Sequence, residues 1–394
     1  MTQDTTSATP RPTPAQAKPA LSLERTTKLV SRALGMTPDA LTAGLRPATP
    51  ADLDAVLALR REVLAEELIW DDAAYLRWRY QFGPSGQGLG VCWVCTRGDD
   101  VIGMIGIERL SLRAGAQQRD VHSVMDIMVR PDLDGSGLGV WINQSVCDRL
   151  GCVLAIGSNP NSKGVVARTF EPLPDRRSFT HPLHMGHFLA RRLSPRWLAW
   201  SLAGVADGLL MGLRIGLLWL TSLWVSVVKA DQLGPEVELL LERAQRSHRV
   251  EVQRSVAGLS QRLLRNPRSH CEVWLAREDG QLTGLMAARR VPMDDGRRGW
   301  QIMDVVLAPG NEGVTLRALL ARVTAHGFRE GADYLSITAY DPELERHLRR
   351  LLFRQQAHEF ETMAWHCPDD VFRQAVRARA GWTLLDIHTD RDQA

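Results

Sequence analysis

The sequence has little net charge, few tyrosines, and cysteines that follow no framework spacing. Its 394 residues carry a formal net charge of +3, which is too small to indicate a nucleic-acid-binding protein. The six cysteines are scattered, so we expect reduced thiols in a cytoplasmic protein. The N-terminus lacks the apolar core of a secretory signal, and its composition predicts a disordered tail over residues 1–22.

Two groups of potential metal ligands are present, and neither favours a metal site. Cys92 and Cys95 form a C-x-x-C pattern within an apolar run that predicts a strand. Residues three apart in a strand point to opposite faces, so the two thiols would not share a metal ion. Between residues 181 and 187 every third residue is histidine, but an intervening proline and glycine argue against a regular helix. We therefore expect no metal.

One stretch of the sequence occurs twice. Residues 124–137 and 302–315 align at one constant offset, and the apolar positions between the identical residues also match. The identical pairs are Met125 with Met303, Asp126 with Asp304, Pro131 with Pro309, and Gly135 with Gly313. A chain of this length can hold two domains of ordinary size. The repeat therefore predicts two copies of one fold.

The repeat divides the chain into a predicted first domain, a connector and a second domain. We place the first domain at 23–175, the connector at 176–233 and the second domain at 234–394. Hydrophobic patterns and turn residues predict the same order in each domain, in which several strands precede a helix and one further strand. This order indicates an α/β fold of the mixed α+β kind.

The predicted elements are as follows. The first domain has predicted helices at 23–34, 50–64 and 140–150 and one further predicted helix that residues 77–80 close, and it has predicted strands at 45–48, 91–96, 101–112, 122–129 and 153–156. The second has predicted helices at 235–249, 259–264 and 315–330, and predicted strands at 271–276, 282–289, 300–307 and 334–338.

A glycine-rich turn follows the repeated strand in the first domain only. The strand ends at Val129, and Gly135, Gly137 and Gly139 then open a helix. Glycines let a backbone approach a ligand closely, and a helix N-terminus favours a negative group, so the turn is typical of a phosphate cradle. Neither the dinucleotide-binding spacing nor a Walker A lysine is present. In the second domain Thr315 and Arg317 replace the last two glycines, and we expect no such ligand there.

This region resembles the acetyl-CoA signature of the GNAT N-acyltransferase family. Asp126, Val129, Pro131, Gly137 and Gly139 fill the positions of that signature. The resemblance covers residues 45–172 well and 250–366 weakly, and it implies a tandem GNAT protein with a degenerate second copy. Each copy would have a central mixed, mostly antiparallel sheet flanked by helices.

The resemblance implies transfer of an acetyl or other acyl group from acetyl-CoA to an amine. It implies that the donor is bound by the end of the repeated strand, by the glycine turn and by one asparagine after the next strand. These cofactor-binding residues are Ile127, Met128, Val129, Gly135, Ser136, Gly137, Leu138, Gly139 and Asn159.

Such a transfer needs a base to take a proton from the amine. Asp126 lies where the family often places its base, and Glu108 on the preceding strand is a second catalytic candidate. The alternative is that Asp126 is structural, because it recurs as Asp304 in the copy without the glycines. The resemblance implies a tyrosine as the general acid, and Tyr80 and Tyr340 are considered for this role. Tyr80 belongs to the cluster at 77–80, which favours a packing role.

One position departs from the family signature. Asp134 stands where the family has glutamine or arginine. A carboxylate near a pyrophosphate is repelled by it. Either Asp134 points to solvent or acyl-CoA binds weakly.

The connector contains arginines at 176, 177, 191, 192 and 196, followed by an apolar run, Trp197–Val228, with glycines at every fourth position from 204 to 216. The part from 209 to 228 is long enough to span a bilayer, but one crossing would separate the two copies. Two alternatives follow. The run lies on an anionic membrane surface, with its arginines facing the headgroups, or it is buried between the copies.

We therefore expect an acyltransferase whose acceptor is a small molecule, such as an amino sugar or another polysaccharide or envelope precursor. It would be cytoplasmic, with peripheral attachment to the inner face of the cell membrane, and its two copies could substitute for a homodimer. The alternatives are a non-catalytic scaffold that keeps the fold, which Asp134 favours, and a Fem-like aminoacyl transferase, which the tandem halves would suit.

Overall fold

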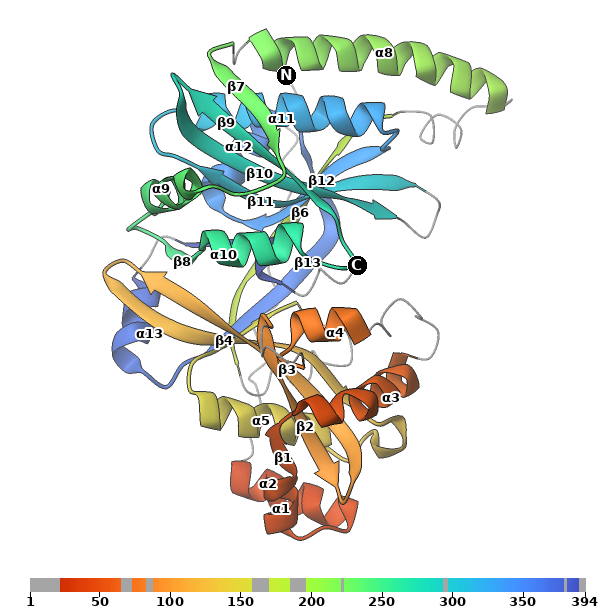
Figure 1. The fold of residues 1–394 in the computed structure, drawn as a ribbon, viewed down its shortest axis with the longest axis vertical. Helices are drawn as coiled ribbons and strands as arrows, with labels where there is room; N and C mark the ends of the chain where they lie inside the picture. Colours follow the sequence, from red (N-terminus) through yellow and green to blue (C-terminus); the bar gives the residue numbers. More distant parts are fainter. Residues whose placement is uncertain are drawn as a thin grey trace, which may run out of the picture.

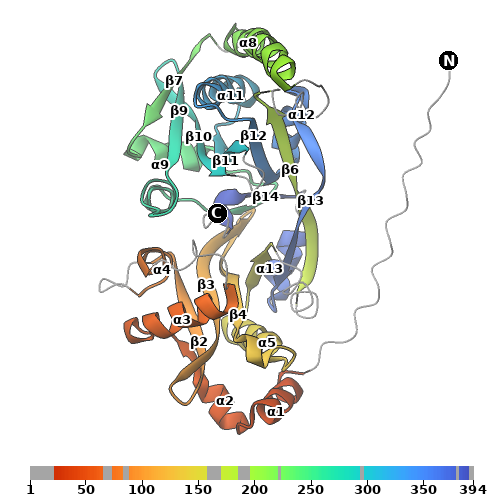
Figure 2. The ribbon, with the colours of Figure 1, turned by 90° about the vertical axis from the view of Figure 1, so that its right-hand side faces the viewer.

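The strands of this protein form one continuous mixed sheet with helices on its faces (Figure 1). The computed structural model describes residues 22–64, 73–82, 88–157, 170–184, 196–220, 223–292, 297–378 and 381–389. The mixed α+β class is as predicted. The first half of the chain lies at one end of an elongated molecule and the second half at the other (Figure 2).

The first half begins with two short helices and continues with most of its strands in a run. Its elements are α1 (Leu23–Leu34), α2 (Pro38–Gly44), β1 (Leu45–Pro47), η1 (Pro50–Asp52), α3 (Leu53–Leu64), α4 (Ala73–Arg79), β2 (Gly90–Arg97), β3 (Asp100–Ala114), β4 (Gln117–Val129), η3 (Pro131–Leu133), α5 (Leu138–Leu150), β5 (Val153–Ile156) and β6 (Glu171–Pro182).

A long helix then leads to the second half. The elements are α8 (Arg196–Leu220), β7 (Val225–Ala230), α9 (Pro235–Arg243), β8 (Val250–Val252), α10 (Val256–Leu259), the π-helix η4 (Ser260–Leu264), β9 (Cys271–Glu278), β10 (Gln281–Pro292), β11 (Arg298–Leu307), α11 (Glu312–Arg329), β12 (Tyr334–Tyr340), α12 (Pro342–Arg350), β13 (Arg354–His366), α13 (Asp370–Arg377), β14 (Trp382–Leu385) and η5 (Asp386–His388).

One predicted helix is shorter than expected. The helix predicted over 235–249 ends at Arg243, because the backbone N–H of Arg246 bonds to the Glu251 carboxylate and residues 250–252 form a strand. The apolar run 209–228 is divided between α8 and β7. Its last residues belong to β7, whose valines are strand formers and which pairs with β9.

The two halves exchange strands at the centre of the sheet. The strand order is β1-β2-β3-β4-β5-β13-β6-β12-β11-β10-β9-β7. The last long strand of the second half, β13, pairs with β5, and β6 of the first half pairs with β12. Residues 176–182 of the predicted connector are therefore part of the sheet. The division into domains at 175 and 233 stays a prediction.

The order of pairing outward from this centre is the same in both halves. In the first half β5 is parallel to β4, and β4, β3 and β2 are antiparallel neighbours. In the second half β12 is parallel to β11, and β11, β10 and β9 are antiparallel neighbours. A register shift interrupts β3–β4 between Met104 and Gly106, and another interrupts β10–β11 between Ala287 and Ala288. The repeated sequence thus corresponds to repeated local geometry.

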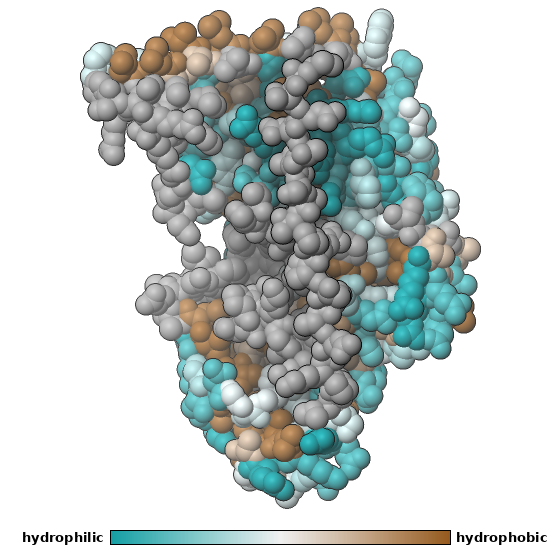
Figure 3. Space-filling model, turned by 180° about the vertical axis from the view of Figure 1, so that it is seen from behind, coloured by the Kyte–Doolittle hydropathy of each residue, from teal (hydrophilic) through white to brown (hydrophobic). Residues whose placement is uncertain are grey.

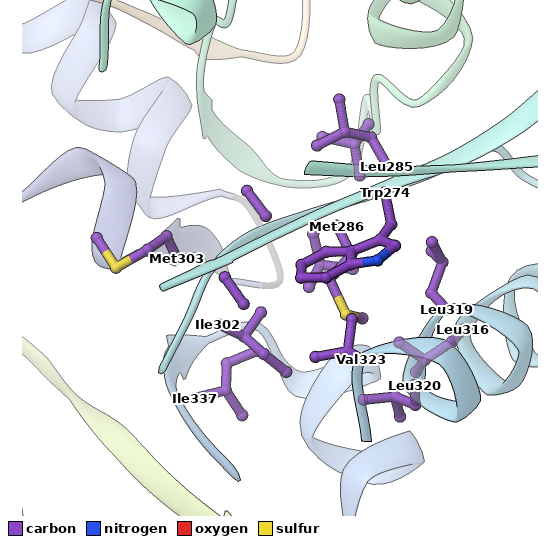
Figure 4. Close-up of a cluster of buried hydrophobic side chains, with 14 of the residues drawn as sticks. Trp274, Leu285, Met286, Ile302, Met303, Leu316, Leu319, Leu320, Val323 and Ile337 are labelled. Carbon is purple, nitrogen blue, oxygen red and sulfur yellow. The ribbon is translucent and has the colours of Figure 1, made fainter. Parts of the chain in front are cut away.

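Separate hydrophobic clusters fill the two faces of the sheet. In the first half Cys95 packs with residues of α1 and α5, whereas Cys92 packs with residues of α3 and α4. The two thiols lie on opposite faces, as predicted. In the second half Trp274, Met286 and Ile302 pack against the apolar side of α11 (Figure 4).

The expectation that all thiols are reduced is wrong for one pair. Cys152 and Cys367 form a disulfide. Cys152 lies just before β5 and Cys367 just after β13, so the antiparallel pairing of these strands brings the two residues opposite each other. Because these residues are far apart in the chain, spacing alone gave no indication of the pairing. The bond joins the exchanged strand β13 to the first half.

His181 and His184 contact groups of the protein itself, and His187 lies outside the described residues. The His181 ring contacts the Arg214 guanidinium of α8 and the carbonyl of Leu352. Burial, and then the charge of Arg214, lowers the pKa of His181 to about 4. His184 is stacked on Phe328.

The environment of His181 predicts that the folded protein loses stability as the pH falls from about 6.5 toward 4. An unfolded histidine takes up a proton near pH 6.5, whereas folded His181 does so only near pH 4. The stability from neutral His181 is therefore present above about pH 6.5 and is lost as the pH falls toward 4. We expect the melting temperature, followed by circular dichroism, to fall across this window. The His181→Gln variant should lose less over the same window, and an equal loss in both proteins would contradict the assignment.

Candidate functional site

An opening in the sheet begins at the repeated aspartate of the first half. Strands β4 and β5 pair only from His122 with Val153 to Val124 with Ala155, although β4 continues to Val129. On its β5 side, the backbone of residues 125–129 is thus not used by this pairing. The predicted donor-binding residues Ile127, Met128 and Val129 are half-buried along this edge, which pairs with no strand on that side within the described residues. A free strand edge can bond to a ligand that carries amide groups.

The glycine turn lies directly beyond this edge. Gly135 and Gly137 have φ angles of 76° and 81°, which side chains with a Cβ rarely adopt. Gly137 caps α5, and the Ser136 hydroxyl accepts a hydrogen bond from the backbone N–H of buried Leu138 at 3.2 Å. A Cβ at Gly139 would lie 3.5 Å from the Val129 side chain. The first N–H groups of α5 point out of the helix, so the turn fits a phosphate group.

The turn also carries carboxylates. The Asp134 side chain is exposed and accepts a hydrogen bond from the backbone N–H of Gly135 at 2.9 Å. Arg130 forms a bidentate ion pair with Asp132 at 2.7 Å. Asp134 therefore occupies one N–H of the turn, and the nearest arginine on this segment is already neutralised. Both features weaken the attraction of this turn for an anion.

Asp126 lies at the mouth of the opening in a strained backbone conformation. Its φ angle is 50°, a value that costs a residue with a side chain about 1 kcal/mol or more. Its carboxylate accepts a hydrogen bond from the Tyr80 hydroxyl at 2.5 Å and lies 3.4 Å from the Arg60 guanidinium. Burial, and then the Asp126 charge, holds the pKa of Tyr80 well above its ordinary value. Tyr80 therefore stays protonated and acts as a donor to Asp126.

Arg60 and Tyr80 come from elements that sequence reasoning did not connect with Asp126. Arg60 lies on α3 and is buried, and Tyr80 follows α4. The Tyr80 hydroxyl passes so close to Gly106 of β3 that a Cβ there would clash with it. The glycine at 106 thus makes room for the tyrosine. No spacing pattern in the sequence relates these residues.

The matching aspartate of the second half has a different setting. Asp304 has no positive φ angle and is fully buried. Its carboxylate forms two hydrogen bonds of 2.9 Å with Arg254 and also accepts from the N–H of Val305. Both oxygens of this carboxylate accept hydrogen bonds from the protein itself, as expected of a structural carboxylate. Asp126 differs from Asp304 in its backbone strain, in its tyrosine partner and in its neighbouring glycine turn.

Glu108, the second catalytic candidate, is buried between two arginines. Its carboxylate lies 3.6 Å from the Arg79 guanidinium and forms an ion pair with Arg262 of η4. Arg262 belongs to the second half of the chain, and the Trp78 indole N–H of the first half donates to the carbonyl of Gln261 nearby. Glu108 thus joins the halves. Its catalytic role stays a prediction.

The remaining predicted residues lie elsewhere. Asn159 falls outside the described residues, as does Asn161. Tyr340 ends β12 in the second half, where burial raises its pKa. Strands β5, β13 and β6 separate β12 from β4, so Tyr340 does not reach the opening at Asp126.

A cavity lies at the corresponding position of the second half. It has a volume of about 560 Å³ and is lined by Val305 and Leu307 of β11, by Pro309 and by residues of α12. Its charged side chains form a network in which Arg246 and Arg249 pair with an acid of α11, an acid of α12 and Asp341, the residue that caps α12. The cavity favours the second half as a ligand site, whereas the glycines and the strained aspartate favour the first. We give more weight to the latter, because Thr315 and Arg317 replace the glycines beside the cavity.

Comparison with solved structures identifies the architecture. A GCN5-related N-acetyltransferase from Anabaena variabilis matches with a TM-score of 0.55 at 10% identity, over 82% of this chain and 72% of that one. An Enterococcus faecalis protein described as a probable N-acyltransferase matches with a TM-score of 0.55 at 8% identity, over 84% and 73%. This chain has the GNAT fold.

The similarity extends to a GNAT-fold enzyme solved with an acyl-CoA. The N-myristoyltransferase of Saccharomyces cerevisiae, solved with bound myristoyl-CoA, matches with a TM-score of 0.51 at 9% identity, over 82% of each chain. No family model and no curated protein matches the sequence. At these identities the structures establish the fold, and the activity has to be argued from the site.

Proposed function

We propose that this protein transfers an acyl group from an acyl-CoA thioester to an amine, and that the donor binds in the first half. The observation that carries the proposal is the combination found at Asp126 and absent at Asp304. A strained, tyrosine-bonded aspartate stands at the mouth of a strand opening, directly before a glycine turn. Structures with this fold include acyltransferases, which supports the reaction class.

The described residues suggest a division of roles. The free edge of β4 at 127–129 would bond the amides of the donor, and the turn at 135–139 would hold its phosphates. The acyl-CoA supplies an activated carbonyl. The amine nitrogen forms a bond to that carbonyl carbon, the carbon–sulfur bond breaks and releases coenzyme A as a thiolate, and the amine loses a proton. Asp126 would accept that proton, directly or through water, and Tyr80 and Arg60 would hold its carboxylate in place.

The acceptor class remains a proposal from the sequence. We favour a small amine, such as an amino sugar or another envelope precursor, with acetyl-CoA as the donor. Asp134 and the Arg130–Asp132 pair favour the alternative of a scaffold that binds no donor. Nothing specific to a Fem-like aminoacyl transferase was found in the described residues.

Calorimetric titration of the intact protein with acetyl-CoA tests the proposal. We expect one binding site per chain, because only the first half keeps the glycines that let a backbone approach a pyrophosphate. The absence of any binding would favour the scaffold. Two equivalent sites would contradict the assignment of the donor to the first half alone.

A further inference from the structure

Among the residues that the structure describes, the largest group of exposed hydrophobic side chains lies on α8, at the end of the molecule farthest from the first half. Figure 3 shows it as a continuous brown band along one edge of the surface. The exposed residues are Trp197, Leu198, Leu202, Val205, Leu209, Leu213, Trp219 and Leu220, and the band continues through Leu223, Trp224 and Val228. We call this set the α8 ridge. Soluble proteins rarely expose such a contiguous apolar surface without a partner.

The opposite side of α8 is fixed to the second half. Ala203, Asp207, Met211 and Leu218 are buried at helical spacing, and α8 packs on α11 (Figure 2). Arg214 contacts His181, lies over the Phe353 ring and donates to the carbonyl of Leu351. The alternative that this run is buried between the halves is therefore wrong, because its outer side is exposed.

The helix does not cross a bilayer in this arrangement. Residues 201–220 are long and apolar enough to do so, but both flanking strands belong to the same sheet. β6 ends before α8 and β7 begins after it, and each is paired along its length. Both ends of α8 thus return to the same body, and the helix lies flat along its surface.

The chemistry of the α8 ridge fits a lipid surface. The charged residues between 197 and 220 are Asp207 and Arg214, and both lie on the packed side. Tryptophans stand at both ends of the ridge, at 197 and at 219 and 224, and this side chain prefers the boundary between water and hydrocarbon. An in-plane helix of this kind buries its apolar face at the level of the headgroups.

Exposed positive charge on α11 favours an anionic surface. Arg322 and Arg329 are exposed on α11, the helix that α8 covers. Within the described residues neither forms an ion pair with a carboxylate. The sequence predicts instead that the arginines of the connector face the headgroups. Two of these, Arg176 and Arg177, pair with carboxylates of the protein itself. Arg176 is fully buried against Asp386, and Arg177 pairs with Glu345.

We propose that the α8 ridge docks this protein, in plane and without crossing, on an anionic lipid bilayer. The exposed glycines at 204, 208 and 212 support a fluid partner, because the space beside each is open and a folded partner would need matching side chains to fill it. The proposal concerns where the protein works and does not depend on the acyl-transfer proposal.

Vesicle flotation of the intact protein tests this docking. We expect binding to vesicles of phosphatidylcholine with phosphatidylglycerol and weaker binding to phosphatidylcholine alone. Leu209→Glu with Leu213→Glu should lower binding at least tenfold. These side chains are 71% and 64% exposed, so their replacement should leave the melting temperature unchanged. The matched control is Leu239→Glu, a 60% exposed leucine of α9 outside the ridge, which should bind as the wild type does.

Further measurements separate the possible partners. Arg322→Glu with Arg329→Glu should remove the preference for anionic vesicles, and brominated lipids should quench the tryptophan fluorescence of the wild type. Binding that survives the double leucine substitution would overturn the proposal. The proposal would also be overturned if the wild-type protein does not bind vesicles, whether it stays monomeric or forms a concentration-dependent dimer. In the second case the ridge would instead cover a second copy of the chain.

Discussion

Replacing Asp126 with asparagine should reduce turnover with acetyl-CoA and an amine by about 10²–10⁴-fold, the usual contribution of a general base. The amide keeps the size of the side chain and can still accept a hydrogen bond from Tyr80, but it cannot take up the proton. Acetyl-CoA affinity should change little, because the donor would contact the β4 edge and the glycine turn. The rate of free thiol release measures the effect.

Asp304→Asn is the matched control for this substitution. It removes the charge from the corresponding position of the second half, where the carboxylate pairs with Arg254 and is fully buried. Its melting temperature should fall, because an arginine is left without its buried partner, while turnover per folded molecule is kept. If Asp126→Asn also lowers only the melting temperature, the repeated aspartate is structural in both halves.

Replacing Arg176 with methionine should destabilise the protein by about 3–5 kcal/mol, because it leaves a buried carboxylate without its cation. Arg176 of β6 lies 2.9 Å from Asp386, and both side chains are fully buried. Asp386 also accepts a hydrogen bond of 2.7 Å from Gln301 of β11. The pair thus joins an exchanged strand to the C-terminal end of the chain. Urea unfolding measures the loss.

A surface pair provides the comparison. Arg109 and Asp120 form an ion pair in which both side chains are well exposed, and Arg109→Met should cost no more than about 1 kcal/mol. The double variant Arg176→Met with Asp386→Leu should recover part of the lost stability, because it removes the unpaired charge as well. Equal losses for Arg176→Met and Arg109→Met would show that the buried pair does not hold the exchanged strands.

The sequence predicted the parts of the fold that depend on local patterns. The strands around Asp126 and Asp304 and the helices after them follow from alternating and helical spacing of apolar residues and from turn residues. The exchange of β6 and β13 was not predicted, because strand pairing between distant segments leaves no local pattern. The same holds for the Cys152–Cys367 disulfide.

The sequence predicted only the part of the candidate site that lies on one contiguous segment. The glycine turn and Asp126 were found because they are contiguous in the chain. The partners that give Asp126 its setting, Arg60 and Tyr80, come from separate helical segments, and only the tertiary structure brings them together. Tyr80 was expected to be a packing residue, and it does pack, but its hydroxyl also donates to the carboxylate.

Titration of two glycine variants with acetyl-CoA tests the central claim most directly. Gly139→Glu places a carboxylate in the first turn of α5, where space and the helix dipole tolerate it, and where it would repel the donor phosphates. Gly313→Glu places the same group beside Arg317 and His347 in the second half. We predict that Gly139→Glu abolishes binding and that Gly313→Glu leaves the single site intact. Binding lost in Gly313→Glu and kept in Gly139→Glu would contradict a donor site in the first half.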